Sequence, residues 1–115
     1  MKKENVILDK TFDFALHIIE LYKQMTEQKE YVISKQLLRC GTCIGANVEE
    51  ATAAISKKDF IAKMSISSKE ARETKYWLRL LDRSKIVNCD LKSHFDEIEH
   101  IIKILTAIVK TSQGG

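Results

Sequence analysis

The residues best placed to do chemistry are basic and lie in one part of the chain, residues 57–85. This segment holds nine Lys or Arg and four Asp or Glu residues, a net +5, while the rest of the chain sums to −2. At about 100° per residue, one arc of a helix carries five of these cations and an aromatic ring. The six residues are Lys69, Arg72, Lys75, Tyr76, Arg79 and Arg83.

Cations in line beside a ring that can stack suit a phosphate backbone, so the pattern predicts a nucleic-acid-binding face. The alternative is a solvated helix face whose charges pair with acidic neighbours such as Glu20 or Asp82. Both interpretations stay open on the sequence.

A second row on the same segment mixes apolar and acidic residues in steps of four and three: Ile66, Glu70, Glu73, Trp77 and Leu80. Trp and Leu in line with two carboxylates are unusual for a solvated face. They predict a subunit interface with Trp77 as anchor and a Glu paired to a partner's Arg. The alternative is that helices of the same chain cover Trp77 while the Glu side chains extend beside it.

The preceding segment carries a matching row of small and hydrogen-bonding residues, which includes Gln36, Arg39 and Cys43. The predicted oligomer interface therefore comprises Gln36, Arg39, Glu70, Glu73 and Trp77. Gly41 and Gly45 lie on the opposite flank, where Gly costs about 1 kcal/mol against Ala in a helix. Close approach of another backbone would explain that cost.

Cys40-Gly-Thr-Cys43 has the spacing of a thiol–disulfide motif, but redox chemistry needs the first Cys at a helix N-terminus. Here the pair falls in mid-helix, which predicts two packed thiols. Cys89 and the three His residues supply no second ligand pair at zinc-site spacing. We therefore predict no metal site at these cysteines.

The histidines and carboxylates give no convergent catalytic set. His17 and His94 are expected at the surface or boundary of two helices. A dimetal bundle needs Glu-x-x-His pairs on facing helices, and Glu97 with His100 is a single such pair, while Glu49 and Glu50 have none. The sequence thus predicts no catalytic residues, no cofactor and no enzyme activity.

The composition indicates one all-α domain over residues 1–115. Pro is absent and the 44% apolar and 30% charged content is typical of a globular protein. No apolar run approaches the roughly 20 residues of a membrane span. The first residues, Met-Lys-Lys-Glu-Asn, lack a signal peptide's apolar run, so a cytoplasmic location with reduced thiols and no membrane partner is expected.

Helices are predicted at about 9–27, 32–54, 57–84 and 90–111, in an antiparallel up-down-up-down four-helix bundle. Asp9 or Thr11 is expected to cap the first helix and Ser56 the third. Residues 112–115 are expected to fray.

Heptad-like faces define the predicted core. On the second helix it comprises Ile33, Leu37, Cys40, Ile44, Asn47, Val48 and Ala51, and on the third Phe60, Met64, Ser67, Ala71, Thr74, Leu78 and Leu81. Asn47 is expected to fix helix pairing. The apolar arc of the first helix, from Phe12, Leu16 and Ile19 round to Phe14 and Ile18, is broad enough to predict burial on more than one side.

Four motifs resemble the four-helix bundle proteins of the 23S rRNA intervening-sequence family, whose members are labelled ribosomal-protein-like. They are Ser34-Lys-Gln-Leu-Leu-Arg39, Ile44-Gly-Ala-Asn-Val-Glu-Glu50, Lys58-Asp-Phe60 and Lys69-Glu-Ala-Arg-Glu-Thr-Lys-Tyr-Trp-Leu78. The resemblance runs from about the first helix to the last. Cys43 stands where the family usually has Ser, which further weakens a redox role.

The resemblance implies a left-handed bundle that self-associates, because structurally known relatives form homopentamers. Among them are the accessory proteins of diversity-generating retroelements, which bind a reverse transcriptase and nucleic acid through a basic surface. No family active site is implied. The expected function is a non-enzymatic oligomeric module that binds nucleic acid, RNA favoured, with a nucleic-acid-processing protein as a further candidate partner. The alternative is a protein-interaction scaffold or accessory subunit without direct nucleic-acid binding.

Overall fold

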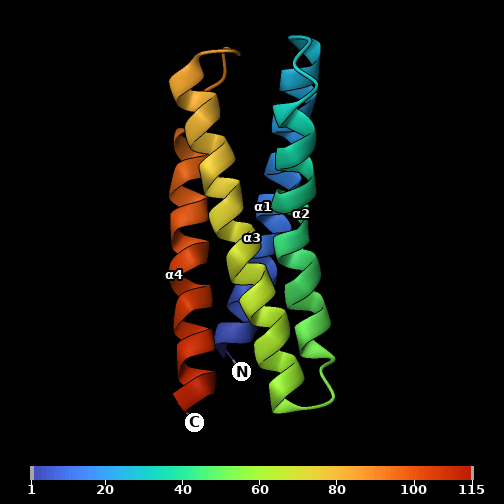
Figure 1. Cartoon of the computed structure of the whole chain (residues 1–115), viewed down its shortest axis with the longest axis vertical. Coiled ribbons are helices and arrows are strands. Elements are labelled where there is room, and N and C mark those ends of the chain that lie inside the picture. The colour runs from blue at the N-terminus through green and yellow to red at the C-terminus, as the bar shows by residue number, and fades with distance from the viewer. Residues whose placement is uncertain (1, 115) are drawn as a thin grey trace.

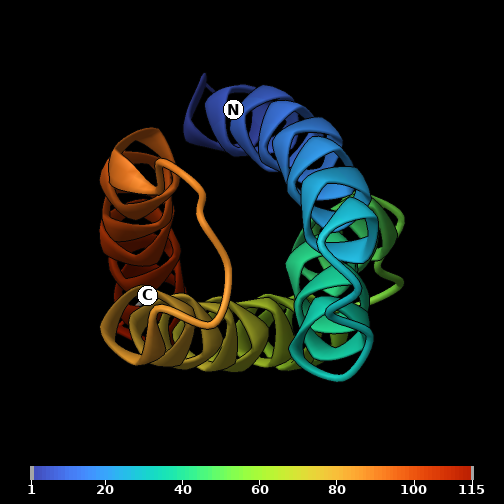
Figure 2. The same cartoon turned by 90° about the horizontal axis from the view of Figure 1, so that it is seen from above.

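Four long helices joined by short connections make up the computed structural model, which describes residues 2–114 and their side chains from Val6 onward. The helices are α1 (Lys2–Glu27), α2 (Ile33–Thr52), α3 (Lys57–Ser84) and α4 (Lys92–Gly114). Figure 1 shows them side by side, with successive helices running in opposite directions. Seen from above in Figure 2, each helix packs beside the next and α4 returns to α1. The predicted antiparallel four-helix bundle is confirmed.

The helices at the two ends of the chain differ from their predicted bounds. α1 begins at Lys2, seven residues before the predicted start at residue 9, so neither Asp9 nor Thr11 caps it. The Thr11 hydroxyl instead donates to the Ile7 carbonyl at 2.7 Å, inside the helix. Ile7 is fully buried, and this burial favours continuation of the helix through the first residues. α4 continues to Gly114, so the predicted fraying is wrong for residues 112–114; Gly115 lies outside the described residues.

The N-termini of the two central helices are capped in different ways. Ser56 caps α3 as predicted, since its hydroxyl accepts from the Asp59 N–H at 3.0 Å, and the Asp59 carboxylate accepts from the Ile55 N–H. At α2 the buried carboxylate of Glu30 accepts from three successive backbone N–H groups at 2.8–3.1 Å, those of Val32, Ile33 and Ser34. Glu30 thus supplies negative charge and acceptors at the positive end of α2.

The predicted core faces of α2 and α3 are largely confirmed. Their fully buried members are Leu37, Cys40, Ile44, Val48, Ala51, Met64, Ser67, Ala71, Thr74, Leu78 and Leu81. Asn47 differs from the prediction: it is half-buried and its amide donates to the Cys43 carbonyl of its own helix. The buried polar link between the two helices is instead Ser67, whose hydroxyl donates to the Ile44 carbonyl at 2.8 Å.

The glycines of α2 lie where α1 approaches most closely, as the prediction of close packing required. A Cβ on Gly41 would lie 2.9 Å from Ile18 Cγ1, and a Cβ on Gly45 would lie 3.3 Å from the Thr11 carbonyl oxygen. The neighbour is therefore a helix of the same chain. α2 runs unbroken through both glycines.

The broad apolar arc of α1 is only partly buried, which corrects the prediction. Phe14, Ile18 and other residues of the inner side are fully buried, but Phe12 is 61% exposed and Leu16 is 49% exposed. The reason is geometric: α1 packs against α2 and α4, and no third helix of the described chain covers its outer side.

Candidate functional site

The basic residues predicted to bind nucleic acid do not all lie free on α3. The Lys75 ammonium pairs with the Glu99 carboxylate of α4 at 2.7 Å, and Arg72 donates to the Thr106 hydroxyl of α4 at 3.3 Å. Both side chains are therefore drawn towards the α3–α4 edge. This pairing with α4 reduces the charge that Lys75 can offer to a ligand.

The other four residues of the set form a more open group. Within the described side chains, no carboxylate lies within ion-pair distance of Lys69, Arg79 or Arg83. Tyr76, Arg79 and Arg83 line one hollow of about 280 Å³ with Leu80, and the Tyr76 ring is 51% exposed. We define Lys69, Tyr76, Arg79 and Arg83 as the α3 basic face.

The residues predicted as an oligomer interface meet in one cluster between α2 and α3. The Arg39 guanidinium contacts Glu73 and Glu70 and donates to the Gln36 side chain at 3.2 Å, and the Trp77 indole N–H donates to Glu73 at 3.0 Å. The hydrogen bond from Trp77, together with the charge of Arg39, lowers the pKa of Glu73 below its ordinary value. We call these five residues the Arg39 cluster.

Within this cluster the Arg and Glu residues pair inside one chain, whereas the interface hypothesis paired a Glu with a partner's Arg. Trp77 is half-buried and packs against the core, as the alternative interpretation expected for helices of the same chain. Beside it on α3, Ile66 and Leu80 are 41% and 38% exposed. An interface role for this edge of the bundle stays a prediction.

A surface that the sequence analysis assigned to the core is an exposed row on α1. Phe12, Leu16 and Ile19 follow one another at helical spacing, and we call them the α1 stripe. A mostly apolar groove of about 260 Å³ runs beside it to Thr42 and Ala46 of α2. The one sequence signal for its exposure was the border of acidic residues next to it, which includes Asp9, Asp13 and Glu20.

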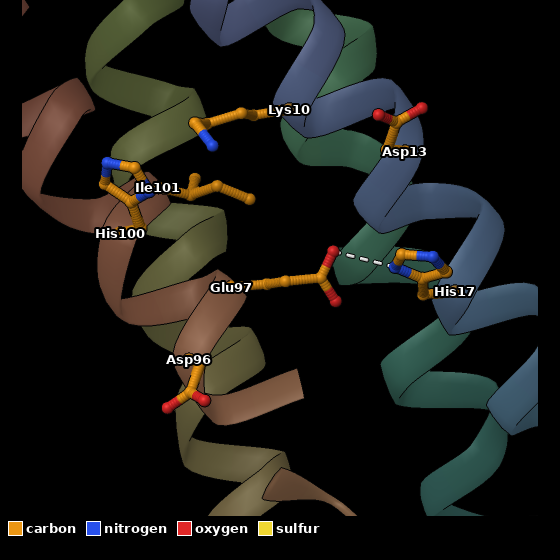
Figure 3. Close-up of a pocket in the computed structure, with 7 residues that line it drawn as sticks. All are labelled: Lys10, Asp13, His17, Asp96, Glu97, His100 and Ile101. Carbon is orange, nitrogen blue, oxygen red and sulfur yellow. Dashed lines mark hydrogen bonds and ion pairs between the residues drawn. The ribbon is translucent and has the colours of Figure 1, made fainter. Parts of the chain in front are cut away.

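A groove of about 300 Å³ between α1 and α4 brings together His17, Glu97 and His100, three of the residues considered above as catalytic or metal-binding candidates (Figure 3). His17 Nδ1 donates across it to Glu97 Oε2 at 2.7 Å, while His100 lines the same groove without contacting Glu97. The described residues contain no group of three His, Cys, Asp or Glu side chains arranged to hold a metal ion. The Glu97–His100 pair therefore gains no further ligands.

His94 lies deeper at the α1–α4 interface, and its Nδ1 atom is buried with no hydrogen-bond partner among the described residues. Burial lowers the pKa of His94 below its ordinary value of 6.5, against the opposing effect of Glu97. The unfolded chain then binds this proton more readily than the native protein does. Stability from the neutral His94 is complete above pH 6.5 and is lost as the pH falls towards its native pKa.

We therefore expect the free energy of unfolding to fall between pH 7.5 and pH 5.5, as measured by urea denaturation. His94→Gln should flatten this part of the profile, because its amide has no proton to gain. His100→Gln, at an exposed position of the same groove, should leave the slope unchanged. Equal slopes in the wild type and the His94 variant would contradict the assignment.

The cysteines have the environment of packed thiols. Cys40 is fully buried, and burial raises its pKa to about 11, so that the reactive thiolate is scarce at neutral pH. Cys43 is half-buried, and Cys40, Cys43 and Cys89 are free thiols. None of the described helices contains a stretch long and apolar enough to cross a membrane.

Comparison with known proteins identifies the family of this chain. Residues 3–107 match the family model described as 23S rRNA-intervening sequence protein. The chain belongs to this family. A crystal structure of an S23 ribosomal protein family member from Bacteroides thetaiotaomicron, described as a protein of unknown function, is 48% identical. The match covers 94% of this chain and 98% of that one, with a TM-score of 0.90. A search of the curated proteins finds no match.

Membership of the 23S rRNA-intervening sequence protein family agrees with the resemblance seen in the sequence motifs. All four motifs fall inside the matched residues, and they contain the Arg39 cluster and two members of the α3 basic face, Lys69 and Tyr76. The family description names no activity and no ligand.

Proposed function

We propose that this protein is a non-enzymatic, self-associating helical-bundle module that binds nucleic acid through the α3 basic face, with RNA as the favoured ligand. The observation that carries the proposal is the combination of Lys69, Arg79 and Arg83 without a described ion pair, beside the half-exposed Tyr76 ring. Cations already paired in the native protein must break those pairs to bind phosphate. Unpaired cations need not, and they release counterions from the nucleic acid directly.

The spacing of the face suits a single strand. Tyr76, Arg79 and Arg83 line one hollow, so a base could stack on the ring while the guanidinium groups contact the adjacent phosphates. Three phosphate contacts on a single strand predict a slope of about −2 for log affinity against log salt. Assembly of several copies would multiply a weak face into a tighter binder.

The test is a charge reversal at the three unpaired positions, Lys69→Glu, Arg79→Glu and Arg83→Glu. We expect binding to fluorescent single-stranded RNA, measured by anisotropy at 50 mM salt, to weaken by at least about a hundredfold, because contacts to charged groups each contribute roughly 1.5–3 kcal/mol. Structured RNA, single-stranded DNA and duplex DNA are measured in parallel.

The matched control reverses three exposed lysines elsewhere, Lys35, Lys57 and Lys103, and so changes the net charge equally. It should bind RNA within a few-fold of the wild type. If both triple variants lose affinity alike, overall charge explains binding and the α3 basic face is not the site.

Self-association is proposed to join two unlike apolar surfaces. The α1 stripe lies on one helix, and Ile66, Trp77 and Leu80 lie on the diagonally placed α3, so contact between them is head-to-tail. Head-to-tail contacts generate a ring when the rotation closes, and the family resemblance implies five copies. The α3 basic face borders this contact, because Leu80 lines the same hollow as Tyr76, Arg79 and Arg83.

The second candidate is a protein-interaction scaffold without nucleic acid. The exposed α1 stripe favours it, because contiguous exposed apolar surface marks sites of protein contact. Under this hypothesis a different protein covers the stripe. Loss of the captured partner on nuclease treatment would support nucleic-acid binding, and its retention would support the scaffold.

A further inference from the structure

A groove on the outer side of the bundle, between α3 and α4, gathers phosphate-binding chemistry. Its volume is about 250 Å³, and its polar lining consists of two cations, three hydroxyls and one amide: Arg72, Lys110, Ser65, Ser68, Thr106 and Gln113. No carboxylate among the described residues lines it. Every one of these groups can donate a hydrogen bond, and an anion with several acceptor oxygens needs such a set.

The contact between Arg72 and Thr106 leaves donors available. Arg72 Nη2 donates to Thr106 Oγ1 at 3.3 Å across the groove, so the Thr106 hydroxyl accepts there and keeps its own proton to donate. The guanidinium has five N–H donors, and this is its one side-chain hydrogen bond within the described residues. The other N–H groups of the Arg72 guanidinium can donate to two oxygens of a phosphate group at once.

The opposite side of α4 provides a comparison within the same molecule. The groove between α1 and α4 is lined by three carboxylates, those of Asp13, Asp96 and Glu97, against the single ammonium of Lys10. The two grooves beside α4 therefore differ in the sign of their charged lining. Of these two grooves, the one between α3 and α4 is the one whose charge suits an anion.

We propose that the α3–α4 groove is a phosphate-binding site. Its occupant is a phosphate group held by Arg72 and Lys110 and oriented by the Ser65, Ser68 and Thr106 hydroxyls. The inference rests on the proposed nucleic-acid function only for the source of that group, which is either an internal phosphodiester or a terminal phosphate. Arg72 flanks the α3 basic face, so a strand lying on that face would bring a phosphate to the groove.

The first test uses inorganic phosphate as the probe, titrated into the full chain at constant ionic strength and followed by amide NMR shifts. We expect saturable shifts in residues 65–72 and 106–113. Arg72→Gln and Lys110→Gln should each weaken binding by at least about tenfold.

Lys103→Gln is the matched control, because Lys103 is exposed two helical turns before Lys110 on the same side of α4 and lies outside the groove lining. It should leave the phosphate affinity unchanged. Shifts that never saturate, or an equal loss in the Lys103 variant, would overturn the proposal. Unchanged melting temperatures in all three variants verify that the fold is intact.

The second test separates the two sources with one RNA oligonucleotide carrying either a 5′-phosphate or a 5′-hydroxyl. A terminal-phosphate site predicts tighter binding of the phosphorylated form, with the difference lost in Arg72→Gln and Lys110→Gln. An internal site predicts equal affinity for both forms and an equal loss in the variants. Saturable inorganic phosphate without any RNA binding would support the groove while refuting the proposed function. RNA binding that both groove variants leave unchanged would overturn the groove.

Discussion

Replacing Phe14 with alanine is expected to lower the free energy of unfolding by about 3–5 kcal/mol, the usual cost of truncating a buried aromatic ring. Phe14 is fully buried on the inner side of α1, among the core residues of the bundle. A domain of this size has only about 5–15 kcal/mol of stability, so the variant should be partly unfolded at elevated temperature. Urea denaturation followed by circular dichroism measures the change.

Phe12→Ala is the matched control, since it removes the same ring two residues earlier in the same helix. Phe12 is 61% exposed, and its truncation should change the stability of the monomer by no more than about 0.5 kcal/mol. The comparison tests the orientation of α1 directly. Comparable losses in the two variants that do not depend on protein concentration would mean that the outer side of α1 is covered within the chain, whereas a loss in Phe12→Ala that grows with concentration would indicate cover by a second copy.

Introducing carboxylates into the α1 stripe, as Phe12→Asp with Leu16→Asp, is expected to convert the protein to a monomer at micromolar concentration. Two charges at the centre of an apolar contact cost at least about 2 kcal/mol, equivalent to roughly a 30-fold weaker association. Analytical ultracentrifugation of the wild type and the variant measures the change. The positions are exposed in the single chain, so helical content should be retained.

Trp77→Ala tests the other surface of the proposed head-to-tail contact. It should weaken assembly more than it lowers monomer stability, because the indole is the anchor of the proposed contact. Lys103→Asp, an acidic substitution at an exposed position of α4, which carries neither surface of the contact, serves as the control and should assemble normally. A wild-type protein that sediments as a monomer at micromolar concentration would refute self-association through either surface.

The sequence predicted those parts of the fold that depend on local periodicity and on local end signals. The steps of four and three from Met64 to Leu81 identified the buried face of α3, because residues at that spacing share one side of a helix. The Ser56–Asp59 signal fixed the start of α3 because both partners lie within one turn. Motif resemblance identified the family over nearly the whole chain, as the match at residues 3–107 bears out.

Capping by Glu30 could not be read in the same way. Its carboxylate reaches three backbone N–H groups only because the connection folds back with Lys29 at φ 67°, and the sequence marks those residues simply as polar. The start of α1 was misplaced for a related reason. Ile7 is buried by the rest of the bundle, and that burial is a long-range effect absent from the local pattern.

By itself, then, the sequence determined that the chain forms four amphipathic helices and which faces of α2 and α3 meet, because both properties repeat with the helical period. Tertiary structure alone decided which charged residues outside the core are ion-paired, and which apolar residues are exposed to solvent. Lys75 and Arg39 are paired with carboxylates on neighbouring helices, whereas the side chains of Arg79 and Phe12 are exposed. Helical spacing places a residue on a side of its own helix, and only the neighbours decide whether that side is covered.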